Sequence, residues 1–97
     1  MLDSLTLDTF TPQIGRTFHL HADDAVLPLT LTAVDALGGE SGHTRRRPFS
    51  LTFHAATGPA LPQSIYRIES ETIPDLELFL VPLGPDAQGM RYEAIFT

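Results

Sequence analysis

The stretch Phe49–Ala55, with the sequence FSLTFHA, decides the fold class of this chain. Apolar and polar residues alternate along it, with Phe49, Leu51, Phe53 and Ala55 in one set and Ser50, Thr52 and His54 in the other. A period of two places each set on its own face of a β-strand. The stretch therefore predicts a strand with one apolar face and one polar face.

The same alternation recurs on both sides of this stretch. It predicts strands over 17–22, 27–33 and 90–96, whose apolar sets are Phe18, Leu20 and Ala22; Leu27, Leu29, Leu31 and Ala33; and Met90, Tyr92, Ala94 and Phe96. Residues 65–68 predict a weaker strand. Residues 76–81 are almost continuously apolar, which predicts a central strand that is covered on both faces.

Turn-forming residues separate the six predicted strands. Asp23-Asp24 favours a tight hairpin. Six strands at short spacing predict a mainly all-β fold, a small six-stranded antiparallel barrel or sandwich. Pro28 predicts an edge position within its strand, whereas the last strand, Met90–Thr97, has no proline and is expected to leave an edge available for pairing.

One short helix is expected ahead of the strands, over Leu7–Ile14. Asp8 is its predicted N-cap, and Gly15 is its predicted stop. The apolar faces of the strands together predict the core, which consists of Phe18, Leu20, Leu29, Leu31, Phe49, Leu51, Phe53, Leu78, Leu80, Tyr92 and Phe96.

Length and composition narrow the classes of function. The 97 residues fit a single β domain, 1–97. A net charge of −6 opposes binding to nucleic acid or to an anionic membrane. The absence of cysteine excludes disulfides and thiolate metal sites. The start of the chain, Met1–Ser4, lacks the basic and apolar segments of a signal peptide, so a cytoplasmic location is expected.

Three histidines are the candidate metal ligands. His19 and His21 share one face of a predicted strand, and His54 has the same outward phase on another strand. Three neutral imidazoles can bind zinc and activate a water molecule in the fourth position. The alternative is that they are solvent-facing residues of amphipathic strands, which we favour because the sequence places no carboxylate to orient them.

Arg45, Arg46 and Arg47 are the candidate partner-binding residues. They form a basic triplet in an otherwise acidic chain, and guanidinium groups bind carboxylates well. An acidic surface on a protein partner or on a second copy is the expected complement, and the segment that carries Glu69, Glu71, Asp75 and Glu77 is one candidate. The alternative is a solvated loop that leads into a strand.

Catalytic and cofactor motifs are missing from the sequence. Ser50, Ser64 and Ser70 have no Gly-x-Ser-x-Gly context, and no glycine-rich phosphate loop follows a strand. Tyr66 and Tyr92 fit core or rim positions, with the hydroxyl reaching water or a carbonyl group. We therefore expect neither enzymatic activity nor a cofactor.

The chain resembles a small bacterial family that is described only as a domain of unknown function. The resemblance extends over nearly the whole chain and rests on Phe10, Gly15, Phe18, Arg47–Leu51, Leu61–Gln63, Tyr66-Arg67, Leu78–Pro82, Gly84–Asp86 and Met90–Phe96. Genes of that family often neighbour those of phage-tail-collar-like fibre proteins. The resemblance therefore implies an accessory or structural role in a fibre or tail-like assembly, and it implies no catalytic residue.

Three hypotheses for function follow. The leading one is a non-catalytic interaction module that offers strand edges or the Arg45–Arg47 loop to a protein partner or to itself. The second is a small metal-dependent enzyme that uses His19, His21 and His54. The third is a carrier with a ligand inside the barrel, which small barrels disfavour because side chains fill them.

Overall fold

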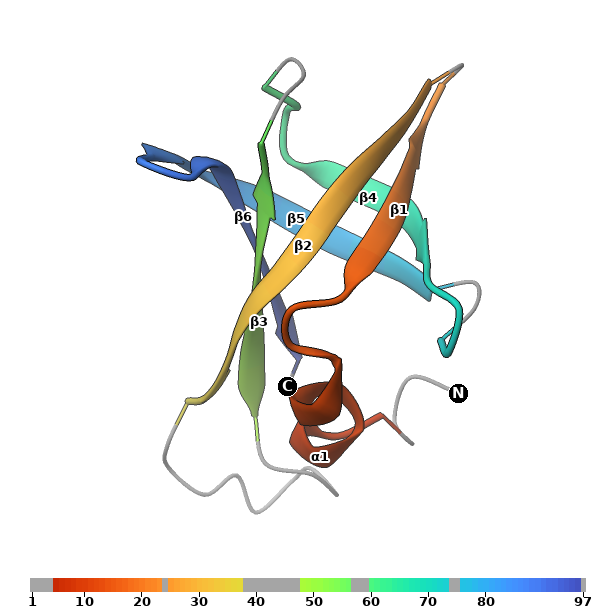
Figure 1. Cartoon of the computed structure of the whole chain (residues 1–97), viewed down its shortest axis with the longest axis vertical. Helices are drawn as coiled ribbons and strands as arrows, with labels where there is room; N and C mark the ends of the chain where they lie inside the picture. Colours follow the sequence, from red (N-terminus) through yellow and green to blue (C-terminus); the bar gives the residue numbers. More distant parts are fainter. Residues whose placement is uncertain (1–4, 24, 38–47, 57–59, 74–75, 97) are drawn as a thin grey trace.

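A computed structural model shows a closed antiparallel barrel of six strands with one short helix ahead of it (Figure 1). The structure describes residues 5–23, 25–37, 48–56, 60–73 and 76–96. The strands are β1 (Thr17–Ala22), β2 (Ala25–Ala36), β3 (Phe49–Ala55), β4 (Ser64–Glu69), β5 (Leu76–Asp86) and β6 (Gly89–Phe96). Their order around the barrel is β1-β2-β3-β6-β5-β4. The predicted six-stranded antiparallel fold is confirmed.

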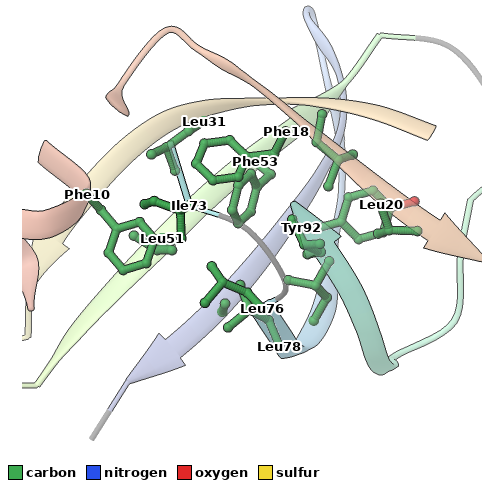
Figure 2. Close-up of a cluster of buried hydrophobic side chains, with 14 of the residues drawn as sticks. Phe10, Phe18, Leu20, Leu31, Leu51, Phe53, Ile73, Leu76, Leu78 and Tyr92 are labelled. Atoms are coloured by element: carbon green, nitrogen blue, oxygen red, sulfur yellow. The ribbon is translucent and has the colours of Figure 1, made fainter. Parts of the chain in front are cut away.

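The core lies inside this barrel and is made by the inward face of each strand (Figure 2). All eleven predicted core residues are buried. Aromatic rings fill much of the interior, and Phe18 meets Phe53 edge to face with ring centroids 5.4 Å apart. The alternation did not identify four further buried side chains, because they lie outside the clear period-two runs or at their ends: Phe10, Ile68, Ile73 and Leu76.

The helix α1 (Leu7–Phe10) continues into a 3₁₀ turn, η2 (Thr11–Gln13), and lies at one end of the barrel (Figure 1). The N-cap is Thr6, whose N–H donates to the Thr9 hydroxyl at 3.0 Å. The prediction of Asp8 as N-cap is wrong, because the helix begins at Leu7 and Asp8 lies in its first turn. Phe10 is fully buried and lies 5.4 Å from the Phe96 ring, so the helix covers this end of the core.

The prediction that Ala33 shares the apolar face of Leu31 is wrong, because β2 contains a β-bulge. The register of β2 with β3 shifts between Leu31 and Ala33. One extra residue inverts the alternation beyond it, so Ala33 pairs with Thr52 on the outer face instead of sharing the inner face with Leu31. The inward position passes to Val34, which pairs with Leu51.

The prediction that residues 76–81 form a strand covered on both faces is wrong. Leu76, Leu78 and Leu80 are buried, but Phe79 is 51% exposed. A closed barrel of this size has one interior, so each strand has an inner face and an outer face. The outer face of β5 carries Glu77 and Phe79.

The predicted strand edges are mostly closed by the barrel. β6 pairs with β3 on one side and with β5 on the other, so the prediction of a free edge at Met90–Thr97 is wrong. Pro28 pairs with His19 of β1, and the pairing of β2 with β3 begins only at Thr30. Among the described residues, Pro28 therefore has a partner strand on one side alone, as its ring predicts.

Candidate functional site

His19 and His21 lie two residues apart on the outer face of β1, whereas His54 lies on the outer face of β3. Thr30 of β2 pairs with both Thr17 of β1 and His54 of β3, so His54 is level with Thr17 and two strands away from it. His21 lies four residues further along β1, roughly 13 Å along the strand. The described part of the chain contains no group of three or more His, Asp or Glu side chains that could hold a metal ion. The geometry does not bring the proposed zinc ligands together.

His21 is bonded to a carboxylate that the sequence did not reveal. Its Nε2 lies 2.5 Å from Oε1 of Glu69, on the neighbouring strand β4. This hydrogen bond is the main reason why the pKa of Glu69 lies below its usual value. The expectation that no carboxylate orients the histidines is therefore wrong, because pairing of β1 with β4 brings together residues 48 positions apart.

His54 lies between a carboxylate and a hydroxyl. Its Nε2 is 2.8 Å from Oδ2 of Asp86, and its Nδ1 is 2.8 Å from the hydroxyl oxygen of Thr32. The hydrogen bond with His54, followed by one from the Gln88 N–H, lowers the pKa of Asp86. The network ties the β2 bulge to β3 and to the β5–β6 hairpin.

Thr32, His54 and Asp86 are linked in the order hydroxyl, imidazole and carboxylate, which is also the order of contacts in a catalytic triad. Its hydroxyl, however, has a structural partner, since it also lies 3.2 Å from the carbonyl oxygen of Thr52 on β3. A hydroxyl that donates to a neighbouring strand stabilises the pairing across the bulge. We assign this network to the barrel framework.

The two tyrosines bond to the loop that precedes β4. Tyr92 is fully buried, and its hydroxyl accepts a hydrogen bond from the Leu61 N–H at 2.9 Å. The Tyr66 hydroxyl donates to the Pro62 carbonyl at 2.6 Å, as its predicted rim position implies. Burial raises the pKa of Tyr66. Both side chains are structural.

The predicted partner-binding residues Arg45, Arg46 and Arg47 lie outside the described residues. Their proposed acidic complement is divided by the fold. Glu69 is engaged by His21, and Glu77 pairs in register with Arg67 on the outer face of β4 and β5.

An apolar row crosses the outer face of β4, β5 and β6. Ile65 is 64% exposed, Phe79 51% and Ile95 57%. Ile65 and Phe79 are directly opposed in the β4–β5 register. The register that pairs Val81 with Glu93 places Phe79 level with Ile95. Large apolar side chains scattered singly need no explanation, whereas these three form one exposed apolar row across adjacent strands.

Charged side chains border this row. Arg67 and Glu77 form the pair next to it on β4 and β5, and Glu93 lies on β6 opposite Val81. We call the surface formed by Ile65, Phe79 and Ile95, with this border, the apolar face. It has the general layout of a protein interface, with an apolar centre and a polar rim.

Sequence reasoning missed this face because it read 76–81 as covered on both sides. The available signal was Glu77, which has the same phase as Phe79 and opposite phase to Leu78 and Leu80. A carboxylate is almost never buried without a partner, so Glu77 marks the outward phase of the strand.

Comparison with known proteins places the chain by family alone. A family model described as a domain of unknown function, DUF6916, matches residues 5–96. Searches of curated proteins and of solved structures found no match. No helix in the described residues has the length and apolar character needed to cross a membrane.

Proposed function

Since the chain belongs to the DUF6916 family, whose description assigns no activity, we propose its function from its own geometry. The protein is a non-catalytic module that binds another protein through the apolar face of β4, β5 and β6. The observation that supports this proposal most strongly is the exposed row of Ile65, Phe79 and Ile95.

The row is large enough to contribute binding energy. Fully burying a side chain of the size of Phe or Ile contributes about 1.5–3 kcal/mol. Each of these three is at least half exposed, so a partner that covers them removes a substantial apolar area from water. Their spread over two strand spacings, roughly 10 Å, suits the centre of an interface.

The border of the face favours a different protein over a second copy. Glu77 and Glu93 place two carboxylates beside the row, against the one guanidinium of Arg67. Face-to-face pairing of two copies would bring these carboxylates near their equivalents, in molecules that each carry a net charge of −6. A partner with an apolar centre and a basic rim avoids that repulsion and gains complementary charge.

The finer parts of the proposal come from the sequence. The Arg45–Arg47 triplet is a second contact, which binds an acidic region of the same partner. The family resemblance implies that the partner belongs to a fibre or tail-like assembly. Replacing the three arginines with alanine should weaken partner binding without lowering thermal stability. Binding by this variant should also depend less on salt concentration than binding by the wild type, because salt screens the charge pairs that the variant lacks.

The test is capture of a partner from a lysate of the source cells by the purified full-length chain. The variant Phe79→Ser removes the centre of the apolar face, and Val26→Ser is the matched control because Val26 is 54% exposed on β2, away from the face. We expect one partner to be retained by the wild type and the Val26 variant, and at least tenfold less by the Phe79 variant.

Three results would contradict the proposal. One is equal retention of the partner by the Phe79 and Val26 variants, with both shown to be folded by circular dichroism. Another is a wild-type chain that forms a dimer which the Phe79→Ser change dissociates, since the face would then be occupied by a second copy. The third is that no protein is retained by the wild type.

A further inference from the structure

A polar depression lies on the barrel wall away from the apolar face. It has a volume of about 350 Å³ and is lined by Gly15, Arg16, Thr17, His19, Ser70, Glu71 and Thr72. The first four belong to the entry into β1 and to β1 itself, and the last three follow β4. This volume is at the lower end of small-molecule sites, so it suits a ligand of monosaccharide size.

The wall formed by residues 15–17 is held in place by backbone bonds. Gly15 adopts a φ of 92°, which favours glycine because it has no Cβ. Its N–H donates to the carbonyl of Leu31 at 2.7 Å, and the Leu31 N–H donates to the carbonyl of Arg16 at 3.1 Å. These bonds fix Arg16 and Thr17 against β2.

The opposite wall, residues 70–72, is also fixed. The Ser70 N–H donates to the carbonyl of Ile73, and the Ile73 N–H donates to the Ser70 hydroxyl at 3.0 Å. Ile73 is buried in the core and anchors this turn. The Thr72 hydroxyl donates to Oε1 of Gln13 at 2.8 Å, which joins the turn to the helical segment. The backbone of both walls is therefore held in place by the fold.

Ser70 and Thr72 hydrogen-bond within the fold, whereas four other polar side chains that line the depression have no such partner among the described residues. In the described structure, the side chains of Arg16, Thr17, His19 and Glu71 make no hydrogen bond or ion pair. Arg16 and Glu71 carry opposite charges on the two walls of one depression, yet they do not form an ion pair. Groups of both kinds are thus available to a ligand.

From this arrangement we propose that the depression binds a small hydroxylated anion, such as a sugar acid or a sugar phosphate. Arg16, His19 and the Thr17 hydroxyl donate hydrogen bonds to its carboxylate or phosphate group. Glu71 can only accept, so it binds the hydroxyl groups of the ligand, and the Thr72 oxygen, whose proton points to Gln13, accepts as well. A bare anion leaves the Glu71 side of the depression without a partner and places two negative charges close together.

The test is calorimetric titration of the full-length chain with four probes: glucose 6-phosphate, glucuronate, glucose and inorganic phosphate. We expect one of the two acidic sugars to bind at least tenfold more tightly than both glucose and inorganic phosphate. The better acidic sugar identifies phosphate or carboxylate as the natural group. Arg16→Ala should weaken its binding at least tenfold, because a charged hydrogen bond is lost.

One further variant tests the Glu71 side of the depression, and two variants elsewhere on the barrel serve as controls. Glu71→Gln should reduce the preference for the acidic sugar over inorganic phosphate, whereas Glu77→Gln, an equivalent change on the outer face of β5, should leave that preference unchanged. Arg91→Ala removes a guanidinium from β6, three strands away from β1 around the barrel, and is the control for Arg16. All variants are compared by circular dichroism.

Four outcomes would overturn the proposal. They are no measurable binding of either acidic sugar, equal binding of glucose, equal binding of inorganic phosphate, and unchanged binding by a folded Arg16→Ala variant. None of them bears on the apolar face, which lies on other strands.

Discussion

Phe53 and Phe79 are the same residue type on opposite faces of the barrel wall. Phe53 is fully buried against Phe18, and Phe79 is 51% exposed on the outer face. We expect Phe53→Ala to lower the free energy of unfolding by about 3–5 kcal/mol, because it opens a cavity in a closed core. Phe79→Ala should cost less than about 1 kcal/mol, since an exposed surface position is involved. Urea unfolding measures both, and equal losses would show that the inner and outer faces are wrongly assigned.

For single residues, the sequence predicts burial correctly where buried and exposed side chains alternate along a strand. The alternation at Phe49, Leu51 and Phe53 predicts their burial correctly, because a barrel strand has one wet face. It does not predict the position of Phe10, whose burial depends on where the helix docks. Apolar residues occupy both phases of β5, so Glu77, which shares the phase of Phe79, is the only residue of 76–81 that indicates the exposure of Phe79.

At the scale of the element, two glycines of the β5–β6 hairpin differ in the space around them. Gly84 has a φ of 94° and open space around it, whereas Gly89 has a φ of 125° and an added Cβ there would lie 2.3 Å from the carbonyl oxygen of Ala55. Gly84→Ala should therefore cost only backbone strain, about 1–2 kcal/mol. Gly89→Ala adds an overlap with the backbone of β3 and should cost about 2–5 kcal/mol.

Thermal unfolding of the two glycine variants measures this difference. A Gly89→Ala protein as stable as the Gly84→Ala protein would mean that the end of β3 does not approach the hairpin as described.

Two histidine–carboxylate pairs join strands and make stability depend on pH. His21–Glu69 links β1 to β4, and His54–Asp86 links β3 to β5. Since the hydrogen bonds lower the pKa of both carboxyl groups in the folded state, the folded protein holds the ionised forms more strongly. Their contribution is present above the ordinary carboxyl pKa, about 4, and is lost as the pH falls through the lowered values.

The effect should be small because both carboxylates are partly open to solvent, with side-chain exposures of 37% for Glu69 and 39% for Asp86. Melting temperatures recorded from about pH 5 down to about pH 2 should fall for the wild type and fall less for Asp86→Asn. If the melting temperature falls equally with pH in both proteins, the ionisation of Asp86 does not contribute to the pH dependence of stability.

These pairs also mark a limit of sequence reasoning. Glu69 lies 48 residues from His21, and the two meet only because β1 pairs with β4 and closes the barrel. The bulge at Leu31–Ala33 is a second limit, since one unpaired residue reverses the phase of the rest of β2. Alternation gives strands and faces, whereas strand order and register require tertiary packing.

For the whole molecule, the barrel is closed and its interior is occupied by the core. The inward side chains fill the interior (Figure 2), which disfavours the hypothesis of a ligand carried inside. β6 has partners on both sides, so a partner cannot extend the sheet along that strand. Both of our proposals therefore place recognition on the outer wall, at the apolar face and at the polar depression.

The most direct measurement of the central claim uses the five isoleucines of the chain. Ile65 and Ile95 lie on the apolar face, Ile14 is 45% exposed elsewhere, and Ile68 and Ile73 are buried. Methyl NMR of the isoleucine-labelled protein, titrated with the captured partner, should shift or broaden the Ile65 and Ile95 signals and leave the other three unchanged. Perturbation of Ile14 with no change at Ile65 and Ile95 would contradict binding through the face of β4, β5 and β6.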